Sequence, residues 1–494
     1  MTTTETQATF DVRNPATGEV VGTYPRTTRD EVDATVARAR AAAAWWSQLS
    51  YRDRAERLGA FRGAIARNFT DLTRVVHEET GKPTGEAALE IALILDHVAW
   101  AAKHARRVLG PQRRGSSLMS FHLGATVEYR PLGVVGVIGP WNFPVMTPLG
   151  SIAFALAAGN TVVFKPSEFT PGVGVWLAER FAEAVPEHPV LQVITGEGAT
   201  GDALARSAID KLAFTGSTRT AKRVMAAAAE RLTPVVAECG GKDAFVVDYD
   251  ADLDAAAEAA AWTSLANAGQ ICVGTERLYV HSSVYDEFAE KLAGIVNGVR
   301  AGAGGQLGPL TMPSQLEVVG RHVSEALAAG GRVRAGAVGE PDGQFVQPVV
   351  LEGVPESAAA VREETFGPTV TLAKFDDVDE VLRLVNATDY GLGGTVFGKR
   401  RANEIAAGMR SGMVSVNVAL GFAQVPSTPF GGVGASGFGR IHGPEGLREF
   451  AYAHSVVRKR LPAPANFTSF GRTPRQDALL ERFVHLMHDR AGRG

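Results

Sequence analysis

The chain has 494 residues, which is too long for one hydrophobic core and predicts two or three domains. Hydrophobic residues make up 45% of it and charged residues 21%, as in an ordinary globular protein. The net charge is -3 and no long block of like charge occurs, so neither a nucleic acid nor an anionic membrane is indicated as a partner. Two cysteines cannot make a disulfide scaffold, which favours a reducing compartment.

The distribution of apolar residues gives no sign of a membrane segment. Residues 1–15 are polar and lack the basic and apolar regions of a signal peptide. The longest apolar stretch, residues 149–164, is interrupted by Ser151, Gly159 and Asn160 and is shorter than the about 20 residues that a transmembrane helix needs. The sequence therefore predicts a cytoplasmic protein.

Three helical patterns come first. Thr28 and Glu31 form a capping box at the start of an alanine-rich stretch that continues to Trp46. Two further helical patterns cover residues 52–80 and 85–108. None of them contains metal-ligand spacing or a phosphate-binding loop, so we expect packing helices, and no metal site is predicted.

From residue 134 the chain alternates short β-branched runs with helical patterns. The expected strands are residues 134–138, 161–164, 190–195 and 211–214, and the expected helices are residues 147–158, 172–184 and 200–207. Buried parallel strands have this composition, so the stretch predicts a doubly wound α/β sheet, which binds its ligand at the carboxyl ends of its strands. Residues 118–129, just before it, are extended in pattern and predict a strand outside this sheet.

The loops after three of these strands have residues suited to a nucleotide. They read GPWNFP at 139–144, KPSE at 165–168 and FTGST at 214–218. Glycine at such a turn lets the backbone approach a pyrophosphate, and the N-terminus of the next helix favours its negative charge. Lys165 and Glu168 are spaced to hydrogen-bond a ribose diol. The usual GxGxxG fingerprint is absent and each loop alone is an ordinary turn, but their joint occurrence favours a nucleotide.

A second α/β pattern begins after Gly241, and a loop with a cysteine lies within it. The loop, residues 265–277, reads LANAGQICVGTER and contains Cys272. The only other cysteine, Cys239, follows Glu238. A thiol in a glycine-containing loop with an upstream carboxylate suggests a covalent catalyst with its own water-activating base. On its own, a free cysteine is more often a buried core residue, and that is the prediction for Cys239.

The chain contains seven short motifs, which follow one another in a fixed order. They are PWNFP at 140–144, KPSE at 165–168, FTGST at 214–218, ECGGK at 238–242, GQICVGTER at 269–277, EETFGP at 363–368 and PFGG…SGFGR at 429–440. In this order, and over residues 10–460, they resemble the NAD(P)-dependent aldehyde dehydrogenase superfamily.

The resemblance implies the fold of that family, which is an α/β fold with two Rossmann-like α/β domains, one for the cofactor and one for catalysis, and a small β oligomerisation domain. By this likeness the NAD-binding domain is residues 1–116 and 132–240, the catalytic domain is residues 241–440, and the oligomerisation strands are residues 117–131 and 447–461. A homodimer or a homotetramer is therefore expected.

Residues 462–494 are a C-terminal extension that departs from most relatives. Thr473 and Gln476 cap a predicted amphipathic helix. Its apolar face consists of Leu479, Leu480, Phe483, Val484 and Met487. Because its charges are of both signs, we expect this face to pack on a partner subunit rather than on a membrane.

The resemblance also implies the roles of individual residues. Cys272 corresponds to the nucleophile, Glu238 to the general base and Asn142 to the side-chain donor of the oxyanion hole. The cofactor-binding positions are Trp141, Lys165, Glu168, Gly198, Phe214, Gly216, Ser217, Glu364 and Phe366.

The implied chemistry explains these residue types. The Cys272 thiolate attacks an aldehyde, and Asn142 with the Cys272 N–H stabilises the negative charge where it develops. After hydride transfer to the nicotinamide, Glu238 activates water to release the acid from the thioester. Two alternatives stay open: a CoA-acylating dehydrogenase, which needs no general base, and a catalytically silent structural member of the family.

Glu168 predicts NAD rather than NADP, because a carboxylate accepts from both ribose hydroxyls but repels a 2′-phosphate.

No arginine is placed to hold a substrate carboxylate, which favours a medium-chain or aromatic aldehyde such as a benzaldehyde. A succinate-semialdehyde-type substrate is the alternative. The expected substrate pocket is Phe143, Gly150, Ile271, Val273, Phe422 and Phe430.

The chain also departs from the family pattern at several positions. Gly434 stands where relatives often have lysine, and Ile441 and Ser151 stand where several relatives have proton-relay residues. We therefore expect water activation to depend more heavily on Glu238. Arg219, where an acidic residue is frequent, adds positive charge beside the phosphates.

Overall fold

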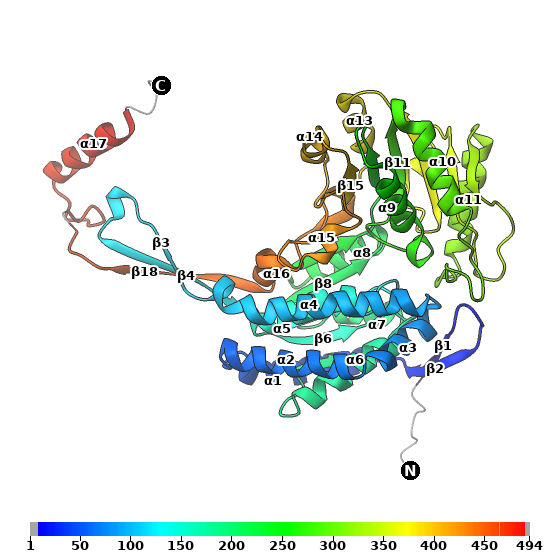
Figure 1. The fold of residues 1–494 in the computed structure, drawn as a ribbon. Coiled ribbons are helices and arrows are strands. Elements are labelled where there is room, and N and C mark those ends of the chain that lie inside the picture. The colour runs from blue at the N-terminus through cyan, green and yellow to red at the C-terminus, as the bar shows by residue number, and fades with distance from the viewer. Residues whose placement is uncertain (1–7, 464, 490–494) are drawn as a thin grey trace, which may run out of the picture. The chain divides into compact units, whose positions relative to one another are not determined.

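The computed structural model describes residues 8–463 and 465–489. The chain divides into two compact units, of which the first consists of Met1–Leu109 and Arg130–Tyr452 and the second of Gly110–Tyr129 and Ala453–Gly494 (Figure 1). We call them the large unit and the small unit. Both α/β sheets lie in the large unit, so the further division into a cofactor domain and a catalytic domain stays a prediction.

A hairpin and four helices open the large unit. The strands are β1 (Thr9–Arg13) and β2 (Val20–Pro25), and the helices are α1 (Arg29–Trp46), α2 (Tyr51–Arg67), α3 (Phe69–Thr80) and α4 (Thr84–Leu109). The predicted capping box of α1 is confirmed, because Glu31 accepts from the Thr28 N–H at 2.8 Å while Thr28 accepts from the Glu31 N–H. The continuous helix predicted over residues 52–80 is wrong, because Asn68 (φ -109°, ψ 28°) breaks it into α2 and α3.

The first sheet of the large unit has the strand order β17-β9-β8-β5-β6-β7. Its strands are β5 (Val134–Ile138), β6 (Thr161–Lys165), β7 (Leu191–Val193), β8 (Lys211–Gly216), β9 (Val235–Cys239) and β17 (Gly437–Phe438). The helices between them are α5 (Met146–Ala158), α6 (Pro171–Ala184), α7 (Gly198–Arg206) and α8 (Thr218–Ala229). All these strands except β17 are parallel, so the predicted parallel α/β sheet is confirmed.

The second sheet has the order β12-β13-β14-β11-β10-β15-β16, and only β12 runs antiparallel to its neighbour. Its strands are β10 (Asp243–Val247), β11 (Thr275–His281), β12 (Arg332–Gly336), β13 (Val349–Glu352), β14 (Thr369–Phe375), β15 (Gly394–Phe397) and β16 (Ser415–Val416). The accompanying helices are α9 (Leu253–Leu265), α10 (Tyr285–Val296), α11 (Gln315–Ala328), α12 (Ala359–Arg362), α13 (Val378–Val385), α14 (Ala402–Gly408), α15 (Gly421–Gln424) and α16 (Gly443–Glu449).

Strand β17 returns the chain to the first sheet after the whole second sheet has been completed. It pairs antiparallel with β9, so that Gly437 lies opposite Glu238. Gly437 has a φ of 99°, and a Cβ there would collide with the carbonyl oxygen of Ala237. Glycine therefore lets the C-terminal loop approach β9 closely, beside the predicted general base.

The described residues of the small unit form a three-stranded sheet in the order β18-β4-β3 and a helix near the C-terminus. The elements are β3 (Gln112–Arg114), β4 (Leu123–Pro131), β18 (Ala451–Lys459) and α17 (Pro474–His488). The strand predicted from residue 118 is wrong at its start, because Leu118–Ser120 is a 3₁₀ turn capped by Ser117. The predicted cap of α17 is confirmed, since the Thr473 N–H donates to Gln476 at 2.8 Å. No helix among the described residues is long and apolar enough to cross a membrane.

Candidate active site

A strained turn carries Cys272 from α9 to β11. After Leu265, the residues Asn267 (φ 52°) and Ala268 (φ 54°) are both left-handed, which is costly for residues with a Cβ. The Asn267 side chain fixes this turn, because its amide donates to the carbonyls of Asn142 and Gln270, each at 3.1 Å. Cys272 therefore lies on a loop whose shape is set before any substrate arrives.

Glu238 lies at the end of β9 within reach of the thiol. The Cys272 Sγ donates to Glu238 Oε1 at 3.7 Å, and the Thr215 hydroxyl donates to Oε2 at 3.2 Å. Burial raises the pKa of Glu238 to about 7, and burial together with the nearby Glu238 raises the pKa of Cys272 well above its ordinary value. The structure thus brings together a protonated thiol and a carboxyl group that ionises near neutral pH, as a general base requires.

Asn142 follows β5 and lies against the cysteine loop. Its side-chain amide donates one N–H to the Gln270 carbonyl at 2.9 Å, and an amide nitrogen has a second N–H to offer. Asn142 and Cys272 line the same cavity. This arrangement is suited to holding a developing oxyanion beside the sulfur.

A buried ion pair that the sequence did not reveal holds the Asn142 loop. Lys82 and Glu90, both almost fully buried, bond at 2.7 Å, and Lys82 also donates to the Asn142 carbonyl at 2.5 Å. Glu90 accepts from the Val145 N–H at 2.9 Å. The helical pattern of residues 85–108 had suggested only packing, and nothing in the spacing of Lys82 and Glu90 indicated their long-range partners.

Two cavities of the large unit meet at Cys272. The first, which we call the apolar cavity, is lined by Cys272, Glu238 and mostly apolar side chains, including Phe143, Ile271, Val273 and Phe430. These four belong to the predicted substrate pocket. The other two predicted pocket residues do not line it: Gly150 lies behind His442, and Phe422 packs on Phe430 with ring centroids 6.2 Å apart.

The second cavity is bounded by predicted cofactor residues. Trp141, Gly216, Ser217, Glu364 and Phe366 line it together with Asn142 and Cys272. The predicted residues outside its lining are Lys165, Glu168, Gly198 and Phe214. Phe214 is buried and packs under the predicted pyrophosphate turn, because a Cβ on Gly216 would lie 2.8 Å from its ring. Gly198 begins α7, where a Cβ would meet nothing within 4 Å.

The loops around the second cavity offer polar groups at fixed places. Lys165 is buried at the end of β6, donates to the Pro166 carbonyl at 2.7 Å and has its Nζ 3.7 Å from Glu168. Ser217 caps α8 by accepting from the Thr220 N–H at 3.3 Å. The strand end at Gly216 therefore leads directly into a helix N-terminus, a geometry that attracts phosphate.

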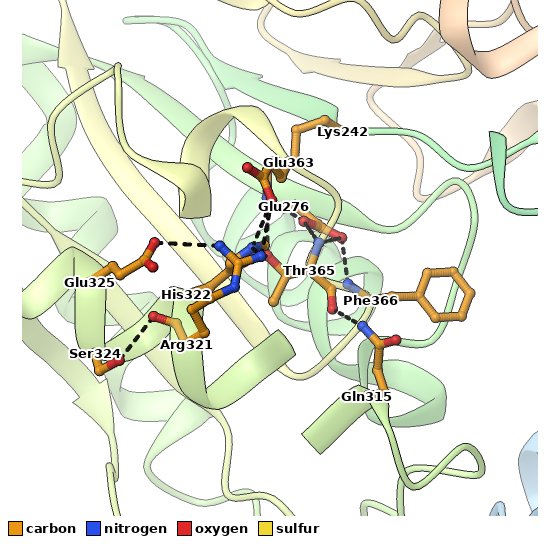
Figure 2. Close-up of polar contacts among 10 residues, drawn as sticks. All are labelled: Lys242, Glu276, Gln315, Arg321, His322, Ser324, Glu325, Glu363, Thr365 and Phe366. Carbon is orange, nitrogen blue, oxygen red and sulfur yellow. Dashed lines mark hydrogen bonds and ion pairs between the residues drawn. The ribbon is translucent and has the colours of Figure 1, made fainter. Parts of the chain in front are cut away.

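Figure 2 shows how the loop with Thr365 and Phe366 is held. Glu276 forms a buried ion pair with Lys242 and accepts from the backbone N–H groups of Thr365 and Phe366 at 2.8 and 2.9 Å. Lys242 also donates to the Thr365 hydroxyl at 3.1 Å. Phe366 is left-handed (φ 52°), and the edge contact of its ring with Trp141 has a centroid distance of 5.6 Å. Sequence analysis did not predict Lys242 and Glu276 as site residues, although they lie in the motifs at 238–242 and 269–277.

Glu364 points back onto the ECGGK turn. Its carboxyl group accepts from the Gly241 N–H at 3.2 Å, and a Cβ on Gly240 would collide with it. Burial, followed by the charge of Glu276, raises the pKa of Glu364 to about 8. The raised pKa favours the neutral form of Glu364. This carboxyl group in the second cavity can therefore hydrogen-bond a ligand without placing a full negative charge there.

A sequence model described as the aldehyde dehydrogenase family matches residues 2–456. The chain belongs to the aldehyde dehydrogenase family. It is an NAD(P)-dependent oxidoreductase that oxidises an aldehyde, so the predicted family, fold class and enzyme class are confirmed.

Its relatives within the family differ in substrate. The 4,4'-diapolycopene aldehyde oxidase of Methylomonas sp. is 35% identical over 92% of this chain and 87% of that protein. The glutarate-semialdehyde dehydrogenase of Pseudomonas putida is 36% identical over 90% of this chain and 92% of that protein. Among solved structures, a putative aldehyde dehydrogenase from Burkholderia cenocepacia has a TM-score of 0.88 at 34% identity and covers 94% of this chain and 96% of that one.

The ion pair of Lys242 and Glu276 gives a first prediction for this aldehyde dehydrogenase. Lys242→Met leaves the buried Glu276 carboxylate without its cation, which should lower the free energy of unfolding by about 3–5 kcal/mol, as measured by urea denaturation. The Kd for the nicotinamide cofactor should rise as well, because Glu276 no longer fixes the loop that carries the predicted cofactor residues Glu364 and Phe366.

The double variant Lys242→Met/Glu276→Gln removes both charges and should recover part of the lost stability. Arg52→Met breaks an exposed ion pair with Glu56 on α2 and serves as the matched control, with nearly unchanged stability. Equal effects of Lys242→Met and Arg52→Met would contradict the structural role of the buried pair.

The raised pKa of Glu238 predicts the pH dependence of turnover. A general base must be ionised, and Glu238 becomes protonated as the pH falls through about 7. We therefore expect kcat to fall about tenfold per pH unit on the acid side of this value, and Glu238→Gln to lower kcat by about 10²–10⁴-fold. A steady-state kcat that stays constant from about pH 8 to about pH 6 would count against Glu238 as the base.

Proposed function

We propose that the enzyme oxidises an apolar aldehyde, medium-chain or aromatic such as a benzaldehyde, to its carboxylic acid with NAD⁺. The observation that carries this proposal is the composition of the apolar cavity, which ends on the predicted nucleophile. Its charged lining residues, among those described, are Glu86, Glu90 and Glu238, and no lysine or arginine lines it. An aldehyde with an apolar body is the ligand that such walls accommodate.

In the proposed mechanism Cys272 forms a carbon–sulfur bond to the aldehyde carbon, and its proton passes towards Glu238, 3.7 Å away. The second N–H of the Asn142 amide and the Cys272 N–H hydrogen-bond the resulting oxyanion. NAD⁺, when bound, accepts the hydride that leaves the thiohemiacetal carbon. Glu238 releases the thiol proton to solvent and, ionised again, takes a proton from the water that adds to the thioester. The carboxylic acid leaves as the Cys272 thiolate takes this second proton from Glu238.

The residues around the second cavity fit a dinucleotide. The Gly216 turn and the N-terminus of α8 suit a pyrophosphate, and Lys165 with Glu168 suits the hydroxyls of the adenosine ribose. Glu364 and Phe366, held by Lys242 and Glu276, suit the nicotinamide ribose and ring. These features support the assignment of the cofactor positions and of an NAD-binding domain at residues 1–116 and 132–240.

Semialdehydes are the competing substrates, because some relatives, such as the glutarate-semialdehyde dehydrogenase, are named for them. A semialdehyde carries a second, anionic end. In this cavity that carboxylate would be buried beside acidic side chains without a cation, which is strongly unfavourable. The presence of Glu238 disfavours a CoA-acylating reaction, because such a reaction needs no general base. The joint placement of Cys272, Glu238 and Asn142 disfavours a catalytically silent structural protein.

Assembly is a further part of the proposal. Strands β4 and β18 form the sheet of the small unit, and α17 presents exposed apolar side chains, among them Leu479, Val484 and Met487. A strand edge and an apolar helix face are both suited to contact another subunit. We therefore retain a homodimer or a homotetramer as the expected state.

The cofactor preference can be tested at Glu168, whose carboxylate lies 3.7 Å from the Lys165 ammonium and accepts from Ser167 at 3.3 Å. The kcat/KM for NAD⁺ should exceed that for NADP⁺ by more than about tenfold, because the carboxylate repels a 2′-phosphate. Glu168→Ser should shrink this ratio, whereas Glu179→Ser, which removes an exposed carboxylate of α6, should not. A wild-type enzyme that prefers NADP⁺ would overturn the assignment.

The substrate class can be tested with a panel of aldehydes and NADH absorbance. Benzaldehyde and medium-chain alkanals should have a kcat/KM at least about 100-fold above that of succinic semialdehyde, because only the latter buries an unpaired carboxylate. Cys272→Ala should abolish NADH formation, whereas Cys239→Ala, which removes the other thiol, should retain turnover. A preference for the semialdehyde would refute the apolar substrate, and an absolute requirement for CoA would refute hydrolysis.

A further inference from the structure

His442 lines the apolar cavity without a hydrogen-bond partner. Its side chain is only 3% exposed, and neither Nδ1 nor Nε2 has a partner among the described residues. Buried ring nitrogens are normally satisfied, because an unpaired polar group away from water loses the hydrogen bonds that it had in the unfolded chain. An unsatisfied imidazole in the wall of a ligand cavity therefore indicates a polar group on the ligand.

The backbone conformation of His442 independently indicates that its side chain has a function. Its φ of 61° and ψ of 169° lie in a region that residues with a Cβ rarely adopt. The surrounding chain fixes this conformation, since the His442 carbonyl accepts from the Gly446 N–H at 2.8 Å at the start of α16. Glycine would adopt this conformation without strain. A histidine at this strained position therefore indicates that its imidazole has a function.

Neighbouring side chains hold the imidazole in one orientation. The rings of His97, Phe154 and Phe430 pack around it, with centroids 4.0, 5.6 and 5.7 Å away. Gly150 of α5 leaves the space for its edge, because a Cβ at that position would lie 2.6 Å from Nε2. Gly150, predicted as a pocket residue, thus acts on the cavity through His442.

The charge state of His442 limits what it can bind. Burial, followed by the nearby His97, lowers the pKa of His442 well below its ordinary value, and burial also lowers the pKa of His97. His97 Nε2 bonds to the Ala423 carbonyl at 3.1 Å and is therefore the protonated nitrogen of a neutral ring. A neutral His442 has one N–H donor and one acceptor, and a hydroxyl group complements both capacities.

We propose that His442 is a specificity-determining residue that hydrogen-bonds a hydroxyl group on the apolar body of the aldehyde, so that hydroxy-substituted aromatic or medium-chain aldehydes are the preferred substrates. This inference rests on the proposed oxidation of apolar aldehydes and narrows their class. A carboxylate in place of the hydroxyl would meet a neutral imidazole and the acidic side chains of Glu86 and Glu90.

The test compares substrates that differ only by a hydroxyl or a methyl group of similar size. The kcat/KM is measured for the 2-, 3- and 4-hydroxybenzaldehydes and the matching methylbenzaldehydes, with the wild-type enzyme and with His442→Phe. Because hydroxyl and methyl groups also alter the reactivity of the carbonyl, the decisive quantity is the change in the hydroxy/methyl ratio between the two enzymes. At one ring position at least, His442→Phe should lower this ratio about tenfold, mainly through KM.

Two further variants keep the test informative if His442→Phe does not fold. Gly150→Ala places a methyl group against the ring and should lower the same ratio by displacing His442. His442→Asn, which tolerates a positive φ and keeps a donor and an acceptor, should retain part of the preference. His188→Phe, a substitution of an exposed histidine outside the cavity, should leave the ratio at its wild-type value.

The outcomes separate the two proposals. If both kinds of benzaldehyde are poor substrates and succinic semialdehyde is a good one, the apolar substrate class itself is wrong. If the benzaldehydes are good substrates but the hydroxy/methyl ratio is the same in the wild type, His442→Phe, His442→Asn and Gly150→Ala, the apolar class stands and the role of His442 is overturned.

Discussion

Two buried lysine–glutamate pairs hold the loops on either side of Cys272. Lys82 with Glu90 fixes the loop that carries Asn142, and Lys242 with Glu276 fixes the loop that carries Glu364 and Phe366. A buried ion pair pays a large desolvation cost, and it is tolerated only when further hydrogen bonds satisfy its remaining lone pairs and protons. Here the backbone groups of the two loops supply those bonds, so the pairs and the loops require one another.

The orientation of these pairs explains the electrostatics of the site. Both lysines are engaged by their own glutamates and by loop atoms, so neither ammonium faces Cys272 or Glu238 as a free cation. Without such a cation, burial dominates, and the pKa of Glu238 rises to about 7. The same cations therefore hold the loops, while the pKa of Glu238, the proposed general base, stays near neutral pH.

The sequence predicted the parts of the site that lie at strand ends. Lys165 and Gly216 follow from short apolar strands and the turns after them, and Glu238 and Cys272 follow from their motifs. What it did not predict depends on pairing between distant segments. Lys82 lies in the loop between α3 and α4 and Glu90 in α4, and their partners at Asn142 and Val145 are more than 50 residues away.

Within single loops and helices, local contacts produced features that the sequence pattern did not predict. The extended pattern of residues 118–129 did not reveal the serine-capped 3₁₀ turn at Leu118–Ser120. Gly150 was expected to border the substrate, but it sits beneath His442, because glycine leaves room for whatever ring lies above it and the sequence does not say which. The positive φ angles of Ala268 and His442 could not be predicted from the residue type, because the surrounding fold imposes this strain.

The departures from the family pattern now have a physical reading. Ile441 lines the apolar cavity and pairs through its backbone with Phe430, so the position expected for a relay carboxylate is apolar. Gly434 has a φ of 63°, and a Cβ there would lie 2.5 Å from the Asp389 carbonyl oxygen, so a lysine would be both strained and crowded. Ser151 is buried in α5 and does not line the cavity. With these three positions unable to supply an acid or a base at the cavity wall, the proposed mechanism assigns proton transfer to and from water to Glu238.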